Sequence, residues 1–356
     1  MIKLSQAHIL GTIIAYLLGI FIVPLVMYYS KKKHLIDKPN ARKIHHGQIS
    51  RLGGIAIWVS IMLTFGSLIL LSYYPKGQGL SGIIVGGSLM FLMGLVDDIF
   101  CLGAKFKLFI QIAIATIVIL LGVRIETLYI PWCQCPLDLG LMTYPITLLW
   151  IVGITNAVNF IDGIDGLAGS IVSICALAIG IVSLVLEPNC QINALMAFIL
   201  MGAMCAFLTF NYNPAKIFMG DSGALYSGFM LATLSITGIV KPSLGGYTMY
   251  LPILILAVPL MDIAYSSIRR IMKGSSPFVA DAEHIHHKLL HAGYSQDKLV
   301  LLLAGFSMVC ALLSIIVVST KSKFIIIALS LIGVLILLNV ISKLIKKSDE
   351  PTEEQN

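Results

Sequence analysis

Four side chains that carry oxygen donors recur at every third position in the stretch 156–169. They are Asn156, Asn159, Asp162 and Asp165, and residues three apart on a helix share one face. The glycines among them weaken a regular helix and let a ligand or another chain approach closely. Hard cations take oxygen ligands in proteins. The stretch therefore predicts a site for a hard cation and a phosphate; the alternative is an ordinary loop between membrane spans.

An acidic pair, Asp97 and Asp98, ends another apolar run and is followed by Lys105 and Lys107. A carboxylate at the centre of a bilayer costs about 2.5–3.5 kcal/mol, so two adjacent ones must reach water or a cation. Adjacent residues on a helix point about 100° apart, so only one of the two faces a given ligand squarely. The pair predicts a second part of the site; the alternative is a hydrated helix end with a nearby ion pair.

A third polar island covers residues 210–223. Asp221 lies between two glycines at the expected start of a helix, with Ser222 as a reasonable cap, and Asn211 belongs to the same island. The alternative is that Asp221 itself only caps the helix.

Two cationic segments complete the set. In 37–54, Arg42, Lys43 and His45 precede the pair Gly53–Gly54, and a helix beginning there could bind an anion through free backbone N–H groups. In the long loop 277–294 the histidines crowd together, and we interpret them as anion contacts, with a zinc site as the alternative: His284, His286 and His287.

Composition gives the elements that must position these residues. The 356 residues are 58% hydrophobic and 12% charged, whereas soluble domains carry about 25% charged residues. Repeated apolar runs of about 20 residues indicate an all-α polytopic membrane protein of about eleven transmembrane helices. We expect one transmembrane catalytic domain, 1–343, and a disordered cytoplasmic tail, 344–356. The expected spans are 8–29, 52–73, 81–97, 106–122, 143–160, 167–186, 192–210, 222–240, 250–270, 299–318 and 324–342.

Charge orients these spans. Eighteen of the 24 Lys and Arg residues fall on one side, which is therefore cytoplasmic. The N-terminus is then outside, the C-terminus is inside, and every polar cluster faces the cytoplasm. The net charge of +7 reports this topology and attraction to membrane lipid and phosphate rather than nucleic acid. Outside, residues 124–143 have a β-like composition, and the sequence leaves open a disulfide among Cys133, Cys135 and Cys190.

The motifs, in this order, resemble the polyprenyl-phosphate N-acetylaminosugar-1-phosphate transferases (glycosyltransferase family 4). They read R-K-I-H, L-V-D-D, N-A-V-N-F-I-D-G-I-D-G, N-Y-N-P…F-M-G-D and D-A-E-H-I-H-H. The resemblance implies Mg²⁺, with Mn²⁺ as the alternative, held by Asn159 and Asp221. It implies a catalytic set of Asp97, Asp98, Asp162 and Asp165. It implies substrate contacts from Arg42, Lys43, His45, Lys105, Lys107, Asn156, Asn211, His284, His286 and His287, with the choice between the two lysines left open.

The implied reaction moves GlcNAc-1-phosphate from UDP-GlcNAc to undecaprenyl phosphate and releases UMP. It would be the first membrane step of a cell-wall or surface-polysaccharide pathway, on the cytoplasmic face of the bacterial plasma (inner) membrane. MurNAc-pentapeptide or another UDP-aminosugar is the alternative within the family. Other classes are a lipid or nucleotide-sugar transporter and an intramembrane aspartyl protease, whose G-x-G-D motif has Phe218 in place of its first glycine. The sequence leaves both a monomer and a homodimer open.

Overall fold

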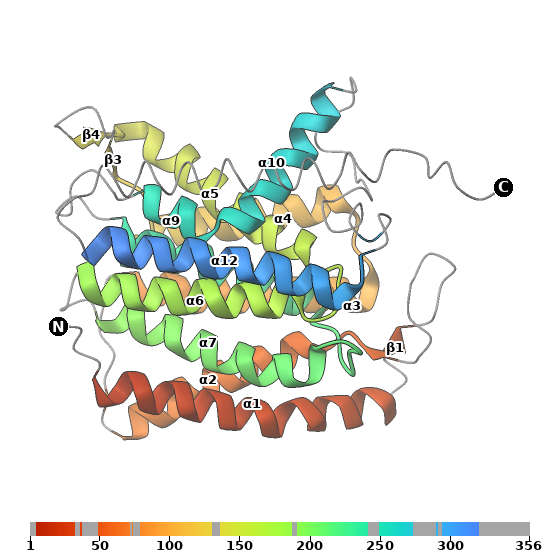
Figure 1. Ribbon diagram of the computed structural model, residues 1–356. Coiled ribbons are helices and arrows are strands. Elements are labelled where there is room, and N and C mark those ends of the chain that lie inside the picture. Colours follow the sequence, from red (N-terminus) through yellow and green to blue (C-terminus); the bar gives the residue numbers. More distant parts are fainter. Residues whose placement is uncertain are drawn as a thin grey trace.

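The computed structural model describes residues 5–32, 36–37, 49–71, 73, 79–129, 136–186, 191–240, 249–272, 290 and 294–319. It is a helical bundle in which α1, α7, α6 and α12 lie side by side in that order (Figure 1). The helices are α1 (Gln6–Lys32), α2 (Gly53–Leu70), α3 (Leu80–Phe100), α4 (Ala104–Leu120), α5 (Thr143–Ile161), α6 (Leu167–Leu186), α7 (Gln191–Asn211), α8 (Gly220–Ile239), α9 (Tyr250–Ile255), α10 (Ala257–Met272) and α12 (Gln296–Ser319), with a 3₁₀ turn η1 (Gly140–Met142) before α5.

Eight helices in the described part of the chain are long and apolar enough to cross a membrane. The chain is therefore a helical, multi-pass membrane protein, as the composition predicts. Nine of the eleven expected spans each coincide with one helix. One expectation needs correction: the span 250–270 is two helices, α9 and α10, separated at Leu256. The eleventh span, 324–342, and the tail, 344–356, lie outside the described residues, so eleven remains a prediction.

Short antiparallel strand pairs flank the helices. β1 (Ile36–Asp37) pairs with β2 (Ile49–Ser50) just before α2. β3 (Thr127–Tyr129) pairs with β4 (Pro136–Asp138) between α4 and α5, which agrees with the β-like composition expected of 124–143.

Helix α8 is the central element, and α2, α3, α5, α6 and α7 all contact it. Glycines allow this close packing, because in lipid the helices associate mainly through van der Waals contact between small residues. A Cβ on Gly94 of α3 would lie 2.6 Å from the backbone oxygen of Asp221. A Cβ on Gly228 of α8 would lie 2.8 Å from the backbone oxygen of Thr155 on α5. The first contact holds the first turn of α8 against α3, and the second holds the middle of α8 against α5.

Candidate functional site

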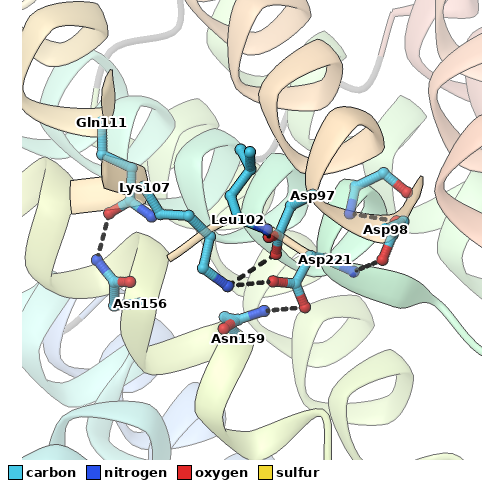
Figure 2. A network of polar contacts seen from close by, with 9 residues as sticks. Asp97, Asp98, Leu102, Lys107, Gln111, Asn156, Asn159 and Asp221 are labelled. Atoms are coloured by element: carbon cyan, nitrogen blue, oxygen red, sulfur yellow. Dashed lines mark hydrogen bonds and ion pairs between the residues drawn. The ribbon is translucent and has the colours of Figure 1, made fainter. Parts of the chain in front are cut away.

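The site is built where four helix ends meet: the end of α3, the first turn of α4, the end of α5 and the first turn of α8 (Figure 2). Each of the three interior polar motifs lies at one of these ends or beside it. Asp97 and Asp98 come from α3, Asn159 from α5 and Asp221 from α8. Residues more than 120 positions apart in the sequence, such as Asp98 and Asp221, are thus brought within hydrogen-bonding distance.

Lys107 is the cation at the centre of this group. Its Nζ atom lies 2.7 Å from Oδ2 of Asp97 and 2.9 Å from Oδ2 of Asp221. The Asp97 side chain is 7% exposed, and the lysine that pairs with it is 25% exposed. Lys105, two residues earlier, is exposed. The geometry therefore places Lys107, rather than Lys105, against the carboxylates.

Asp97 also fixes the turn that delivers this lysine. Its Oδ1 atom accepts a 2.7 Å hydrogen bond from the backbone N–H of Leu102, just after α3 ends. The chain reverses there through Cys101, whose φ of 53° is left-handed. The Asp97 carboxylate thus binds both the turn after α3, through Leu102, and Lys107, which follows that turn.

Asp98 caps α8 from another helix. Its Oδ1 accepts a 2.8 Å hydrogen bond from the N–H of Asp221, and its Oδ2 accepts a 2.9 Å hydrogen bond from the N–H of Ser222. These N–H groups have no partner within α8, because the first turn of a helix lacks preceding carbonyls. The sequence-based assignment of Ser222 as the cap is wrong: α8 begins earlier, after Met219, which makes no side-chain cap.

The two carboxamides on α5 have different partners. Asn159 donates from Nδ2 to Oδ1 of Asp221 at 3.3 Å. Asn156, one turn earlier, donates from Nδ2 to Oε1 of Gln111 on α4 at 2.6 Å, and also to the backbone of its own helix. The sequence analysis missed Gln111. A carboxamide in an apolar helix, four residues after a candidate lysine, is the signal that could have found it.

Asp165 and Asn211 hold the loops of the site. Asp165 Oδ2 accepts from the N–H of Ala215 at 3.0 Å. Asn211 accepts from the N–H of Gly166 at 3.0 Å and donates to the backbone oxygen of Ile217 at 2.8 Å. Both side chains are buried. They therefore tie the α5–α6 turn to the α7–α8 loop, and they act on the site through the backbone.

Asp162 lies at the end of α5, in the turn before α6. Burial raises the pKa of its carboxyl well above the usual value, and the negative charges of Asp221, Asp98 and Asp165 raise it further. Arg51 opposes this shift. Burial and the neighbouring negative charges thus both disfavour the ionised form of Asp162 relative to an exposed carboxyl.

The pair Gly53–Gly54 has a structural role. The N–H of Gly53 donates to the backbone oxygen of Phe218 at 3.0 Å, and that of Gly54 donates to the oxygen of Met219 at 2.9 Å. These N–H groups are satisfied by the chain itself, so the expected anion site at this helix start is not formed by them. The remaining predicted contacts lie outside the described residues: Arg42, Lys43, His45, His284, His286 and His287, as do Cys133, Cys135 and Cys190.

The donor set can be compared with what Mg²⁺ prefers. Around Asp221 the neighbouring side chains offer carboxylate and carboxamide oxygens, and the carboxylates of Asp97 and Asp221 already share one cation, the Lys107 ammonium. Among the described residues no three His, Cys, Asp or Glu side chains form a metal-ligand group. The carboxylate and carboxamide oxygens around Asp221 are ligands of the kind that Mg²⁺ takes, since it commonly binds one or two carboxylates and completes its shell with phosphate oxygens and water. This donor set does not fit a zinc site within the described residues.

Comparison with known proteins places the chain. Residues 80–239 match the model of the family described as glycosyl transferase family 4. The chain is 33% identical over 331 residues to a Bacillus subtilis (strain 168) protein, the probable undecaprenyl-phosphate N-acetylglucosaminyl 1-phosphate transferase, with 92% of this chain and 89% of the relative covered.

Two further relatives come from other bacteria. The decaprenyl-phosphate N-acetylglucosaminephosphotransferase of Mycobacterium tuberculosis (strain ATCC 25618 / H37Rv) is 31% identical, with 85% of this chain and 79% of the relative covered. The undecaprenyl-phosphate alpha-N-acetylglucosaminyl 1-phosphate transferase of Escherichia coli (strain K12) is 30% identical, with 77% and 74% covered. The matched family segment begins with α3 and ends with α8, and therefore holds all four helix ends of the site. The chain belongs to glycosyl transferase family 4.

Proposed function

We propose that the protein transfers GlcNAc-1-phosphate from UDP-GlcNAc to undecaprenyl phosphate and releases UMP. An oxygen of the lipid phosphate forms a bond to the sugar-bearing phosphorus of the donor, and the bond from that phosphorus to the bridging oxygen breaks. The bridging oxygen leaves with UMP. The observation that carries the proposal is the convergence of Asp97, Lys107, Asn159 and Asp221 at one end of the bundle, in a chain whose relatives are named for this transfer.

Lys107 would bind the phosphate of the lipid acceptor. Its Nζ atom lies 2.9 Å from Oδ2 of Asp221, and its side chain is 25% exposed at the start of α4. The acceptor phosphate is largely ionised at neutral pH, since its second pKa is about 6. Catalysis then depends on positioning and charge neutralisation more than on proton removal.

Asp221 and Asn159 would hold Mg²⁺, or Mn²⁺ in its place, facing the donor. When bound, the cation would neutralise charge on the pyrophosphate. Asp98 keeps Asp221 in place by capping its helix, while Asp162 lies close enough for the negative charges of Asp221 and Asp98 to raise the pKa of its carboxyl. Asn211 and Asp165 keep the flanking loops together. Arg42, Lys43, His45 and the three histidines near 284–287 stay proposed donor contacts.

The site would face the cytoplasm, where UDP-sugars are made. Lys31, Lys32, Arg51, Lys216 and Lys298 all lie at or beside helix ends on the same side as the site, which the positive-inside rule makes cytoplasmic. The protein would then belong to the plasma membrane and begin a cell-wall or surface-polysaccharide pathway. A reporter fused after Lys347 should read cytoplasmic and one near Gly77 should read outside; the reverse at both sites would overturn this orientation.

Purified protein, undecaprenyl phosphate and labelled UDP-GlcNAc test the activity directly. We expect a lipid-linked GlcNAc diphosphate and stoichiometric UMP, and loss of both on chelation. Asp221→Asn should lose most turnover, whereas Asp138→Asn, at the opposite end of the bundle, should keep it. UDP-MurNAc-pentapeptide is offered in competition. A lipid product that carries only the peptide-bearing sugar would shift the proposed substrate to UDP-MurNAc-pentapeptide. Turnover that persists in excess chelator would show that the reaction does not require a divalent cation.

A further inference from the structure

Gln111 is a buried carboxamide inside α4, in a run that is otherwise apolar. It is 2% exposed, and its Oε1 atom accepts the 2.6 Å hydrogen bond from Nδ2 of Asn156 on α5. A buried polar side chain costs free energy unless it is hydrogen-bonded, and here the bond joins two different helices. The pair is therefore a specific link between α4 and α5.

The link lies one turn beneath the site on both helices. Lys107 precedes Gln111 by four residues, and Asn159 follows Asn156 by three, so each pair shares a helix face. Lys107 donates to Oδ2 of Asp221, and Asn159 donates to Oδ1 of the same carboxylate. Figure 2 shows the resulting closed ring, in which α4 and α5 meet at Gln111 and Asn156 and meet again at Asp221.

We propose that Gln111 is a positioning residue that sets the separation of α4 and α5, so that Lys107 and Asn159 lie on either side of the Asp221 carboxylate. Van der Waals packing alone lets two apolar helices slide by a fraction of a turn, whereas a short hydrogen bond fixes one register. Displacing catalytic groups by about 1 Å can cost about 100-fold in rate. This role rests on the proposed function only for its kinetic readout.

The variants are chosen to separate positioning from simple packing. Gln111→Met keeps the length of the side chain and removes the acceptor oxygen; Gln111→Glu keeps an acceptor in the same place. Ile112→Met, at the neighbouring lipid-facing position, is the matched control. Asn156→Leu removes the donor, and the double variant with Gln111→Met completes a cycle, because residues that act as one pair give non-additive losses.

We expect Gln111→Met to lower kcat about 10- to 100-fold, with KM for UDP-GlcNAc changed less than about threefold. Gln111→Glu should recover most of the rate, and Ile112→Met should match wild type. The double variant should lose no more than the worse single variant. A wild-type kcat for Gln111→Met, fully additive losses, or a Gln111→Glu rate as low as that of Gln111→Met would overturn the proposal.

A second readout does not need the reaction. Spin labels at the exposed positions Phe109 on α4 and Leu149 on α5 report the distance between the helices. In a background without the native cysteines, the distance distribution should broaden or shift in Gln111→Met and return in Gln111→Glu. An unchanged distribution in Gln111→Met would refute the positioning role even if activity falls. If wild type forms no lipid-linked GlcNAc, the proposed function fails, and the distances still decide the role of Gln111.

Discussion

The Asp98 carboxylate, at the end of α3, accepts a 2.8 Å hydrogen bond from the backbone N–H of Asp221 at the start of α8. One of the two neighbouring acids of the L-V-D-D motif is thus used by a helix more than a hundred residues later. Its partner Asp97 faces Lys107 instead. This division follows from helix geometry, since adjacent side chains diverge by about 100°.

The cap predicts a graded response at Asp98. Asp98→Asn keeps one acceptor oxygen and Asp98→Ala keeps none, so stability should fall in that order, by about 0.5–2 kcal/mol for the full loss of a cap. Turnover should fall in the same order because Asp221 moves with its helix. Thermal unfolding in detergent and lipid-product assays measure the two effects. Equal inactivity of both variants at wild-type stability would instead indicate that Asp98 takes a proton.

The ion pair at Asp221 predicts competition between Lys107 and a divalent cation. Lys107→Met should lose turnover with undecaprenyl phosphate, yet bind Mn²⁺ more tightly without substrate, by about three- to thirtyfold, because a positive charge 2.9 Å from Asp221 is removed. Electron paramagnetic resonance on the purified protein measures the free Mn²⁺. Lys105→Met controls for loss of one charge on the same helix turn and should bind Mn²⁺ as wild type does. An affinity of Lys107→Met no higher than that of Lys105→Met would contradict the competition.

The raised pKa of Asp162 predicts a pH-dependent cost in stability. Because the folded-state pKa lies above the unfolded one, folding favours the protonated acid, and that benefit is lost as pH rises through the folded-state pKa. Asp162→Asn should therefore melt at a higher temperature than wild type at pH 8 in metal-free buffer. The difference should shrink as pH falls towards about 4, near the ordinary carboxyl pKa. If Asp162→Asn is less stable than wild type at pH 8, the raised pKa of Asp162 is contradicted.

The seam between α3 and α8 predicts a steep response to one methyl group. In Gly94→Ala the added Cβ would meet the backbone oxygen of Asp221 at 2.6 Å, which forces the helices apart and costs about 1–3 kcal/mol. Both melting temperature and turnover should fall. Gly66→Ala, where a Cβ on α2 would meet nothing within 4 Å, is the matched control and should equal or exceed wild type in stability. If the two variants behave alike, the close approach is not what positions Asp221.

Sequence patterns predicted most of the architecture because membrane spans carry a strong signal. Nine expected spans each coincide with one helix, and the three interior motifs meet as expected at one end of the bundle. The exception is the span 250–270. There, the polar and basic residues of α10, Asp262 and Arg269 among them, follow an interruption at Leu256 that hydropathy alone does not mark.

The details of the site depended on contacts between distant residues. Lys105 and Lys107 are equally plausible in the sequence, and only packing against α8 selects Lys107. Ser222 is the nearest residue of the right type to cap α8, but the carboxylate that does so comes from Asp98 on another helix. In the same way, the N–H groups of Gly53 and Gly54 are used by carbonyls of residues 218 and 219. Local rules do not reveal such partners.

The central position of α8 has a consequence for biogenesis. Of the eight apolar helices in the described chain, α8 has the lowest mean hydropathy and the largest share of its length buried in protein. Such a segment partitions only weakly from the translocon into lipid. Helix α3, which is synthesised earlier, offers it a glycine-lined face, and Gly228 of α8 itself allows close packing against α5. Asp221 would reach Asp98, Lys107 and Asn159 only when α8 packs against α3 and α5. Errors in these seams should therefore also lower the amount of protein that integrates into the membrane, in addition to any loss of stability and turnover.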